Sequence, residues 1–191
     1  MEEKKMTREE MKLRIRTLMD EVSPSNFSAM DIVGYDDDKP VDAQIEQLLD
    51  ASAIEVLLQR PLCELPTTEA DKSLIRVDAE EGCGYLPKPG DCLRLVSFRL
   101  PGWRRAVCHA TEMDGDGAMR LGNRYLRGGN SRPVVVETEG EFVFYPCDEA
   151  RLKGDAASLR YVAVTLPEDL PRRLQEVVCR RFASEGEMSQ R

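Results

Sequence analysis

The hydrophobic residues of this chain change their period twice. They recur at helical spacing up to about residue 65, alternate at the period of a strand between residues 74 and 166, and return to helical spacing after residue 167. A helical period gathers apolar side chains on one stripe, whereas a period of two gathers them on one face of a strand. The order of helices, strands and helix predicts an α+β protein.

The first two helices are expected between proline boundaries. Thr7 and Glu10 form a capping box, in which the Thr7 hydroxyl accepts from the Glu10 backbone N–H and the Glu10 side chain reaches back. Pro24 ends this first helix. A second helix is expected to begin near Pro40, since proline suits the first turn, and to end at Pro61.

Alternating segments separated by Gly, Pro and Asp turns predict a β-rich middle of about five antiparallel strands. In the segment Cys92 to Leu100, Leu93 and Leu95 alternate with polar residues, so one strand face is expected to be apolar. The five segments are SLIRVDA, CLRLVSFRL, RPVVVETE, EFVFYP and SLRYVAVTL.

The last part of the sequence predicts a C-terminal amphipathic helix. Glu168 and Asp169 are expected at its positive end, with Arg180 and Arg181 near its negative end, as the helix dipole favours. We expect the whole chain to form one α+β unit rather than two independent domains. Its parts are a helical segment (1–65), a β-rich segment (66–166) and the C-terminal helix with its tail (167–191).

Composition excludes several classes of protein. The net charge of −8 argues against a sequence-independent DNA-binding protein, which needs a basic surface to displace counterions. No apolar run approaches the roughly 20 residues of a membrane span, so no membrane partner is expected. The charged N-terminus has no apolar signal-peptide region, and we expect the protein to be made in the cytoplasm.

Metal and catalytic sites are not expected. The 6 cysteines form no CxxC pair and the chain has 1 histidine, so they predict reduced thiols, several of them buried, rather than a zinc site. Cys108 and His109 are neighbours on an extended segment and point to opposite faces, which prevents a nucleophile–base pair. We therefore expect a protein that is not an enzyme and has no cofactor.

Two loops have sequences that partly resemble ligand-binding motifs. The segment EMDGDG (112–117) lacks the residues of a calcium loop in either register, and a hairpin turn is favoured. RYLRGGNSRP (124–133) lacks the phosphate-loop pattern and favours a flexible hairpin. Its arginines, Arg124, Arg127 and Arg132, could contact a phosphate or a neighbour's carboxylate.

The only tryptophan, Trp103, follows a Pro101-Gly102 turn and precedes Arg104 and Arg105. A tryptophan in this position either fills the core of its own chain or anchors an interface, and the sequence leaves both alternatives open. An aromatic residue flanked by arginines is the usual composition of an interface hot spot.

The stretch GYLPKPGDCLRLVSFRLPGWRRAV (84–107) resembles the motif of tailed-phage neck proteins, the head–tail connector or adaptor family that includes tail-tubular-type proteins. That motif has a prolyl segment, LPxDFLRLxS, a short turn, and a Trp followed by basic residues. A looser similarity continues through YLRGGNSRPVVV to Val136. Cys92 stands where the motif has an aromatic residue, and the loop PKPGD is longer than usual.

The resemblance implies a structural virion protein of a phage or prophage, a subunit of a ring that joins portal and capsid to the tail. Its partners would be the portal protein, tail components and further copies of itself. The assembled particle would contain a homo-oligomer, and the isolated subunit could be a monomer. DNA would pass through the ring without specific binding, and the protein would lie in the virion after assembly. The expected subunit-interface residues are Trp103, Arg104, Arg105, Arg124, Arg127 and Arg132.

Two alternatives remain open. One is a non-catalytic protein-interaction or regulatory module of a bacterial host, and the other is a small enzyme with an unrecognised site.

Overall fold

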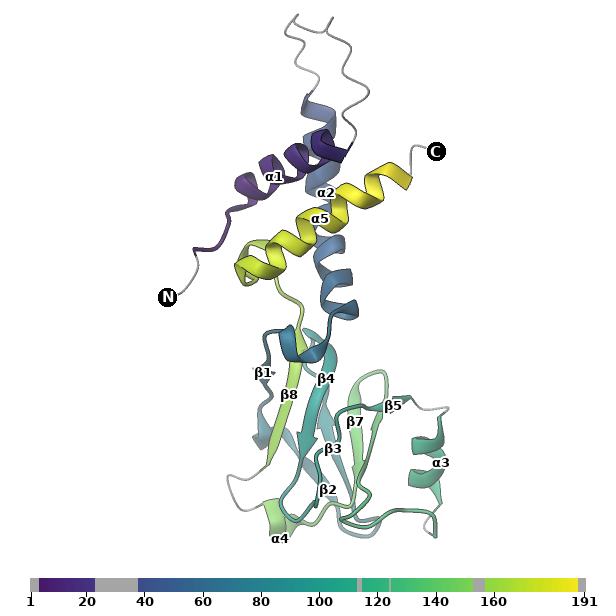
Figure 1. The fold of residues 1–191 in the computed structure, drawn as a ribbon. Helices are drawn as coiled ribbons and strands as arrows, with labels where there is room; N and C mark the ends of the chain where they lie inside the picture. Colours follow the sequence, from purple (N-terminus) through teal and green to yellow (C-terminus); the bar gives the residue numbers. More distant parts are fainter. Residues whose placement is uncertain (1–3, 23–37, 113–114, 124, 153–156, 189–191) are drawn as a thin grey trace, which may run out of the picture. The chain divides into compact units, whose positions relative to one another are not determined.

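The computed structural model describes residues 4–22, 38–112, 115–123, 125–152 and 157–188. It confirms the α+β class, with helices at both ends of the sequence and a mainly antiparallel β-rich middle (Figure 1). The chain divides into two compact units. The helical unit comprises Met1–Pro66 and Val164–Arg191, and the β unit comprises Thr67–Ala163. The expectation of a single unit stays a prediction.

In the helical unit, the C-terminal helix lies against both N-terminal helices. Its core is formed by apolar side chains at helical spacing, such as Ile15, Leu49 and Leu174, each at most 1% exposed. In the described residues, no helix combines the length and apolar character needed to cross a membrane. The elements are α1 (Arg8–Val22), α2 (Asp38–Gln59), η1 (Leu62–Glu64), η3 (Pro167–Asp169) and α5 (Arg172–Met188).

The predicted capping box begins α1. The backbone N–H of Glu10 donates to Thr7 Oγ1 at 3.2 Å, and the backbone N–H of Thr7 donates to Glu10 Oε2 at 2.7 Å. Two amide groups that the first helical turn leaves unpaired are thereby satisfied. The expected stop at Pro24 lies outside the described residues, and α2 begins close to the expected Pro40, at Asp38.

A buried amide ties the segment before α1 to α5. Gln175 is 0% exposed, and both the oxygen and the nitrogen of its side-chain amide form hydrogen bonds. Its Oε1 accepts from the backbone N–H of Met6 at 2.7 Å, while its Nε2 donates to the carbonyl of Met6 at 2.9 Å and to that of Pro167 at 3.1 Å. Because a buried polar group costs free energy unless it is paired, this complete set of bonds lets Gln175 sit in the core.

The C-terminal helix begins later than the sequence suggests. Glu168 and Asp169 lie in the short 3-10 helix η3, and α5 starts at Arg172, so these acids are not in its first turn. Leu170 is extended, with φ −65° and ψ 151°, as is typical of a residue before proline. Pro171 therefore separates the two helical segments.

The β unit contains two sheets. One has the strand order β1-β8-β4 and the other β2-β3-β7-β6-β5, and a hydrophobic cluster takes side chains from both. The strands are β1 (Thr68–Glu69), β2 (Arg76–Asp78), β3 (Cys83–Pro87), β4 (Cys92–Arg99), β5 (Thr111–Glu112), β6 (Val134–Glu137), β7 (Glu141–Tyr145) and β8 (Ser158–Ala163); the short helices are η2 (Lys72–Leu74), α3 (Asp116–Gly122) and α4 (Glu149–Leu152).

The five predicted strands correspond to β2, β4, β6, β7 and β8. The structure adds a strand that is not among these five, β3, which pairs with both β2 and β7. The hairpin turn expected at residues 112–117 is wrong, because α3 begins at Asp116 and β5 runs parallel to β6. Parallel strands need a crossover rather than a hairpin. The segment 124–133, as far as it is described, likewise belongs to the connection from α3 to β6 and is not a hairpin.

The expected alternation in β4 is also wrong. The buried residues are Cys92, Leu95 and Phe98, at a spacing of three, while Leu93 is only partly buried. Register shifts occur between Cys92 and Arg94 and between Leu95 and Ser97. A β-bulge adds a residue to one strand and so changes which side chains face the core.

Candidate functional site

Trp103 lies in the core of its own chain. It is 2% exposed, and its indole Nε1–H donates to the carbonyl oxygen of Pro146 at 2.8 Å. Its ring meets those of Phe98 and Phe144 edge-on, with centroids 5.4 and 6.4 Å away. Of the two alternatives left open by the sequence, the structure places Trp103 in the core, where it offers no surface to a partner.

The expected turn before Trp103 is present. The backbone N–H of Trp103 donates to the carbonyl of Leu100 at 3.1 Å, and Gly102 has a φ of +85°. Pro101 at the second position and a positive-φ glycine at the third are the features of a type II turn. The buried indole and this tight turn fix the direction in which the chain leaves the core.

Arg104 and Arg105 follow this anchored turn and are exposed. The backbone N–H of Arg104 donates to the carbonyl of Asn130 at 2.9 Å, which joins the turn to the loop that carries exposed Arg132. No described residue forms an ion pair or side-chain hydrogen bond with Arg104, Arg105 or Arg132. We call these three residues the arginine turn surface.

Arg127 has a different position. Its Nη1 and Nη2 donate to the backbone carbonyl and the carboxylate of Glu81, both at 2.6 Å, and its Nε donates to the carbonyl of Leu121 at 2.7 Å. The guanidinium also lies 5.5 Å from the ring centre of Tyr145. The hydrogen bond to Glu81 raises the pKa of Arg127 above its ordinary value. Arg127 therefore holds parts of its own chain together, and Arg124 lies outside the described residues.

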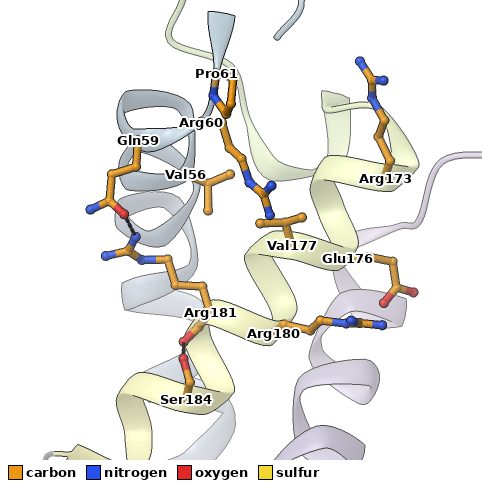
Figure 2. A pocket seen from close by; sticks show the side chains of 10 residues that line it. All are labelled: Val56, Gln59, Arg60, Pro61, Arg173, Glu176, Val177, Arg180, Arg181 and Ser184. Carbon is orange, nitrogen blue, oxygen red and sulfur yellow. Dashed lines mark hydrogen bonds between the residues drawn. The ribbon is translucent and has the colours of Figure 1, made fainter. Parts of the chain in front are cut away.

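A second arginine surface lies in the helical unit, between the end of α2 and one face of α5. It forms an open hollow of about 770 Å³ (Figure 2), which we call the arginine groove. Its apolar floor includes Val56 and Val177. Its other lining residues are Gln59, Arg60, Pro61, Arg173, Glu176, Arg180, Arg181 and Ser184.

The arginines of this groove differ in their partners. Arg60 contacts Glu64 at 3.5 Å, and Arg181 contacts Glu55 and Gln59. Arg173 donates through Nη2 to the backbone carbonyl of Glu64 at 2.6 Å. Arg180 is exposed and contacts no carboxylate among the described residues. Arg173 and Arg180 thus present guanidinium donors that the described residues use only in part.

The sequence did not predict this groove, although part of its pattern is present. Arg173, Val177, Arg180 and Ser184 recur at intervals of three or four residues and so share one face of a helix. The other wall, around Arg60, comes from a distant part of the chain, and no local pattern connects the two.

The reactive side chains do not form a cluster. Cys108 and His109 are both exposed, as is Cys63. Burial raises the pKa of Cys92 and Cys147 to about 11 and that of Cys179 to about 12. A thiol with such a pKa stays protonated at neutral pH and is a poor nucleophile. Within the described ranges, no group of three or more His, Cys, Asp or Glu side chains could hold a metal ion.

Comparisons of the chain with models of protein families, with curated proteins and with solved structures gave no match.

Proposed function

We propose that this chain is a structural subunit of a ring that joins the portal of a tailed phage, or of a prophage, to its tail. The observation that carries this proposal is the arginine turn surface. A buried tryptophan fixes a tight turn, and the side chains of the two arginines that follow it are exposed and form no ion pair or hydrogen bond with the described residues.

Such an arrangement favours protein contact. The backbone that carries these side chains is fixed by the buried turn, so that ordering this segment costs less conformational freedom on binding. An arginine binds a carboxylate through two parallel hydrogen bonds, and a chain with 35 acidic residues offers many carboxylates on a neighbouring copy. In this role Trp103 acts from within the core, and Arg104, Arg105 and Arg132 make the contact.

The order of the elements supports the same proposal. The resemblance at residues 84–107 implies N-terminal helices, a β-rich middle and a later helix, and this chain has that order. The motif itself forms β3, β4 and the turn that carries Trp103. The net charge of −8 suits a ring through which DNA slides without binding. The proposed role is structural rather than catalytic, with location in the virion.

A co-sedimentation assay with the portal protein encoded in the same gene neighbourhood tests this function. We expect the purified chain to sediment with portal rings, and the double variant Arg104→Gln/Arg105→Gln to lose this association while staying folded. A control with the same change in charge, Arg76→Gln/Arg120→Gln, removes two other exposed guanidinium groups of the β unit and should associate normally, although Arg76 pairs with Glu141 at 2.7 Å. A gene neighbourhood without portal, terminase or tail genes favours the host interaction module instead.

A further inference from the structure

We propose that the arginine groove of the helical unit binds an acidic segment of a partner protein. The groove is distinct from the arginine turn surface, which lies in the β unit. It would bind such a segment whether or not the chain is a ring subunit.

The groove concentrates positive charge in an acidic protein. Four of the ten residues that line it are arginines, in a chain whose net charge is −8. The one acidic residue of the lining, Glu176, accepts at Oε2 from Nε of Arg14 on α1 at 3.4 Å. This ion pair offsets the carboxylate of Glu176, and ion pairs with Glu64 and Glu55 likewise offset Arg60 and Arg181, so Arg173 and Arg180 carry the positive charge that the groove retains.

Arg173 and Arg180 of α5 also retain hydrogen-bond donors for a partner. Arg180 makes no contact with any carboxylate that the structure describes, and Arg173 uses one Nη group on a backbone carbonyl. A planar guanidinium can bind a carboxylate through two N–H groups at once. Arg173 and Arg180 lie seven positions apart on α5, about two helical turns, and Figure 2 shows both side chains projecting from this helix, so two carboxylates of one segment could be bound along it.

The apolar floor indicates a partner larger than a simple anion. Val177 is only partly buried, and together with Val56 it lies between the arginine side chains (Figure 2). A protein segment with acidic and apolar side chains complements both features, as in other recognition of helices and extended peptides by grooves. A single small anion would meet the charge and leave most of the hollow of about 770 Å³ empty.

A protein segment is favoured over nucleic acid because carboxylates border the groove. Glu55 and Glu64 pair with Arg181 and Arg60, and the chain as a whole is acidic. Nucleic acid gains its affinity from many phosphate contacts. A long strand would therefore extend over the acidic surroundings of the groove and be repelled by them. A short segment that contacts only the groove avoids this repulsion.

Fluorescence anisotropy with a labelled peptide of interspersed aspartate and leucine residues tests the proposal on the full-length chain. We expect saturable binding that weakens with salt, and about tenfold weaker binding when the aspartates are replaced by asparagines. Arg180→Gln should weaken binding of the acidic peptide about tenfold without affecting folding, because its side chain is exposed and unpaired among described residues. Arg173→Gln should have a similar effect.

The matched control is Arg172→Gln. Arg172 directly precedes Arg173 on α5, is exposed and lies outside the groove lining. Its Nη1 donates to the carbonyl of Lys4 at 3.2 Å. This variant has the same net charge as the others and should bind the peptide like the original chain. Equal weakening by Arg172→Gln and Arg180→Gln would overturn the proposal. So would tighter binding of labelled duplex DNA that depends on Arg180, or no peptide binding up to about 1 mM.

Discussion

The indole N–H of Trp103 donates a hydrogen bond to the carbonyl oxygen of Pro146, 43 positions further along the chain, at 2.8 Å. This bond joins the turn after β4 to the end of β7, and it satisfies the one polar group of a ring that is otherwise surrounded by apolar side chains. The residue that the sequence marks as most distinctive therefore organises the β unit from within.

The first prediction concerns this ring. Trp103→Ala should lower the free energy of unfolding by about 3–5 kcal/mol, because it leaves a cavity beside Phe98 and Phe144. Trp103→Phe keeps an aromatic ring but leaves the carbonyl of Pro146 without its donor, and should cost about 1–3 kcal/mol. Urea unfolding monitored by circular dichroism measures both. An unchanged midpoint for Trp103→Ala would show that the ring does not support the core.

The second prediction concerns the close approach of β3 to β7. A Cβ atom at Gly84 would lie 2.1 Å from Cε2 of Phe144 and 2.9 Å from Sγ of Cys147. Gly84→Ala should therefore destabilise the fold by about 1–3 kcal/mol through overpacking. Gly90→Ala is the control, since nothing lies within 4 Å of the position that its Cβ would take, and it should change stability by less than about 0.5 kcal/mol. Similar melting temperatures for the two variants would contradict the pairing of β3 with β7.

The third prediction concerns the buried amide of the helical unit. Gln175→Leu has a similar size but leaves the N–H and the carbonyl of Met6 without their partners. Each unsatisfied buried group costs about 1–3 kcal/mol, so this variant should be clearly less stable than the original chain. Hydrogen exchange gives a local measurement, since the amide proton of Met6 should lose protection. Unchanged protection there would exclude the proposed tie between the N-terminal segment and α5.

The fourth prediction concerns pH. Burial raises the pKa of Cys92 and Cys147 from the ordinary value of 9.0 to about 11, and that of Cys179 to about 12. Between pH 9 and about pH 11, the thiols of Cys92 and Cys147 keep their protons in the native protein, whereas the same thiols in the unfolded chain release them. Stability should be fully present below pH 9 and should be lost as the pH rises through about 11.

Urea midpoints measured from neutral pH to about pH 11 test this dependence. Cys147→Ala should make the decline with pH less steep, because one of the titrating thiols is gone. The same slope for Cys147→Ala and for the original chain would show that this buried thiol does not contribute to the loss.

Local signals predicted much of the fold. The capping box of Thr7 and Glu10 is present because both partners lie within one helical turn. The prediction was wrong where tertiary contacts decide. The bulges of β4 depend on its pairing with β8, and they bring Phe98 to the core in place of Leu93. β3 is short and begins beside a glycine, so its own sequence does not distinguish it from a loop.

The candidate surfaces show the same difference between features that local sequence predicts and features that depend on tertiary contacts. The exposure of Arg104 and Arg105 follows from a turn that is visible in the sequence. The role of Arg127 could not be predicted, because its partner Glu81 lies 46 positions away. The arginine groove also needed the structure, since Arg60, which follows α2, and Arg173 of α5 are far apart in the chain and share Glu64 as a neighbour.

Electron microscopy of portal rings from the same gene neighbourhood, after incubation with the chain, tests the proposed function itself. We predict an added ring of density on the portal with the original chain and with Arg76→Gln/Arg120→Gln, and none with Arg104→Gln/Arg105→Gln, whose circular dichroism should be unchanged. Bare portals in the presence of the folded original chain would contradict the proposal that this protein is a connector subunit.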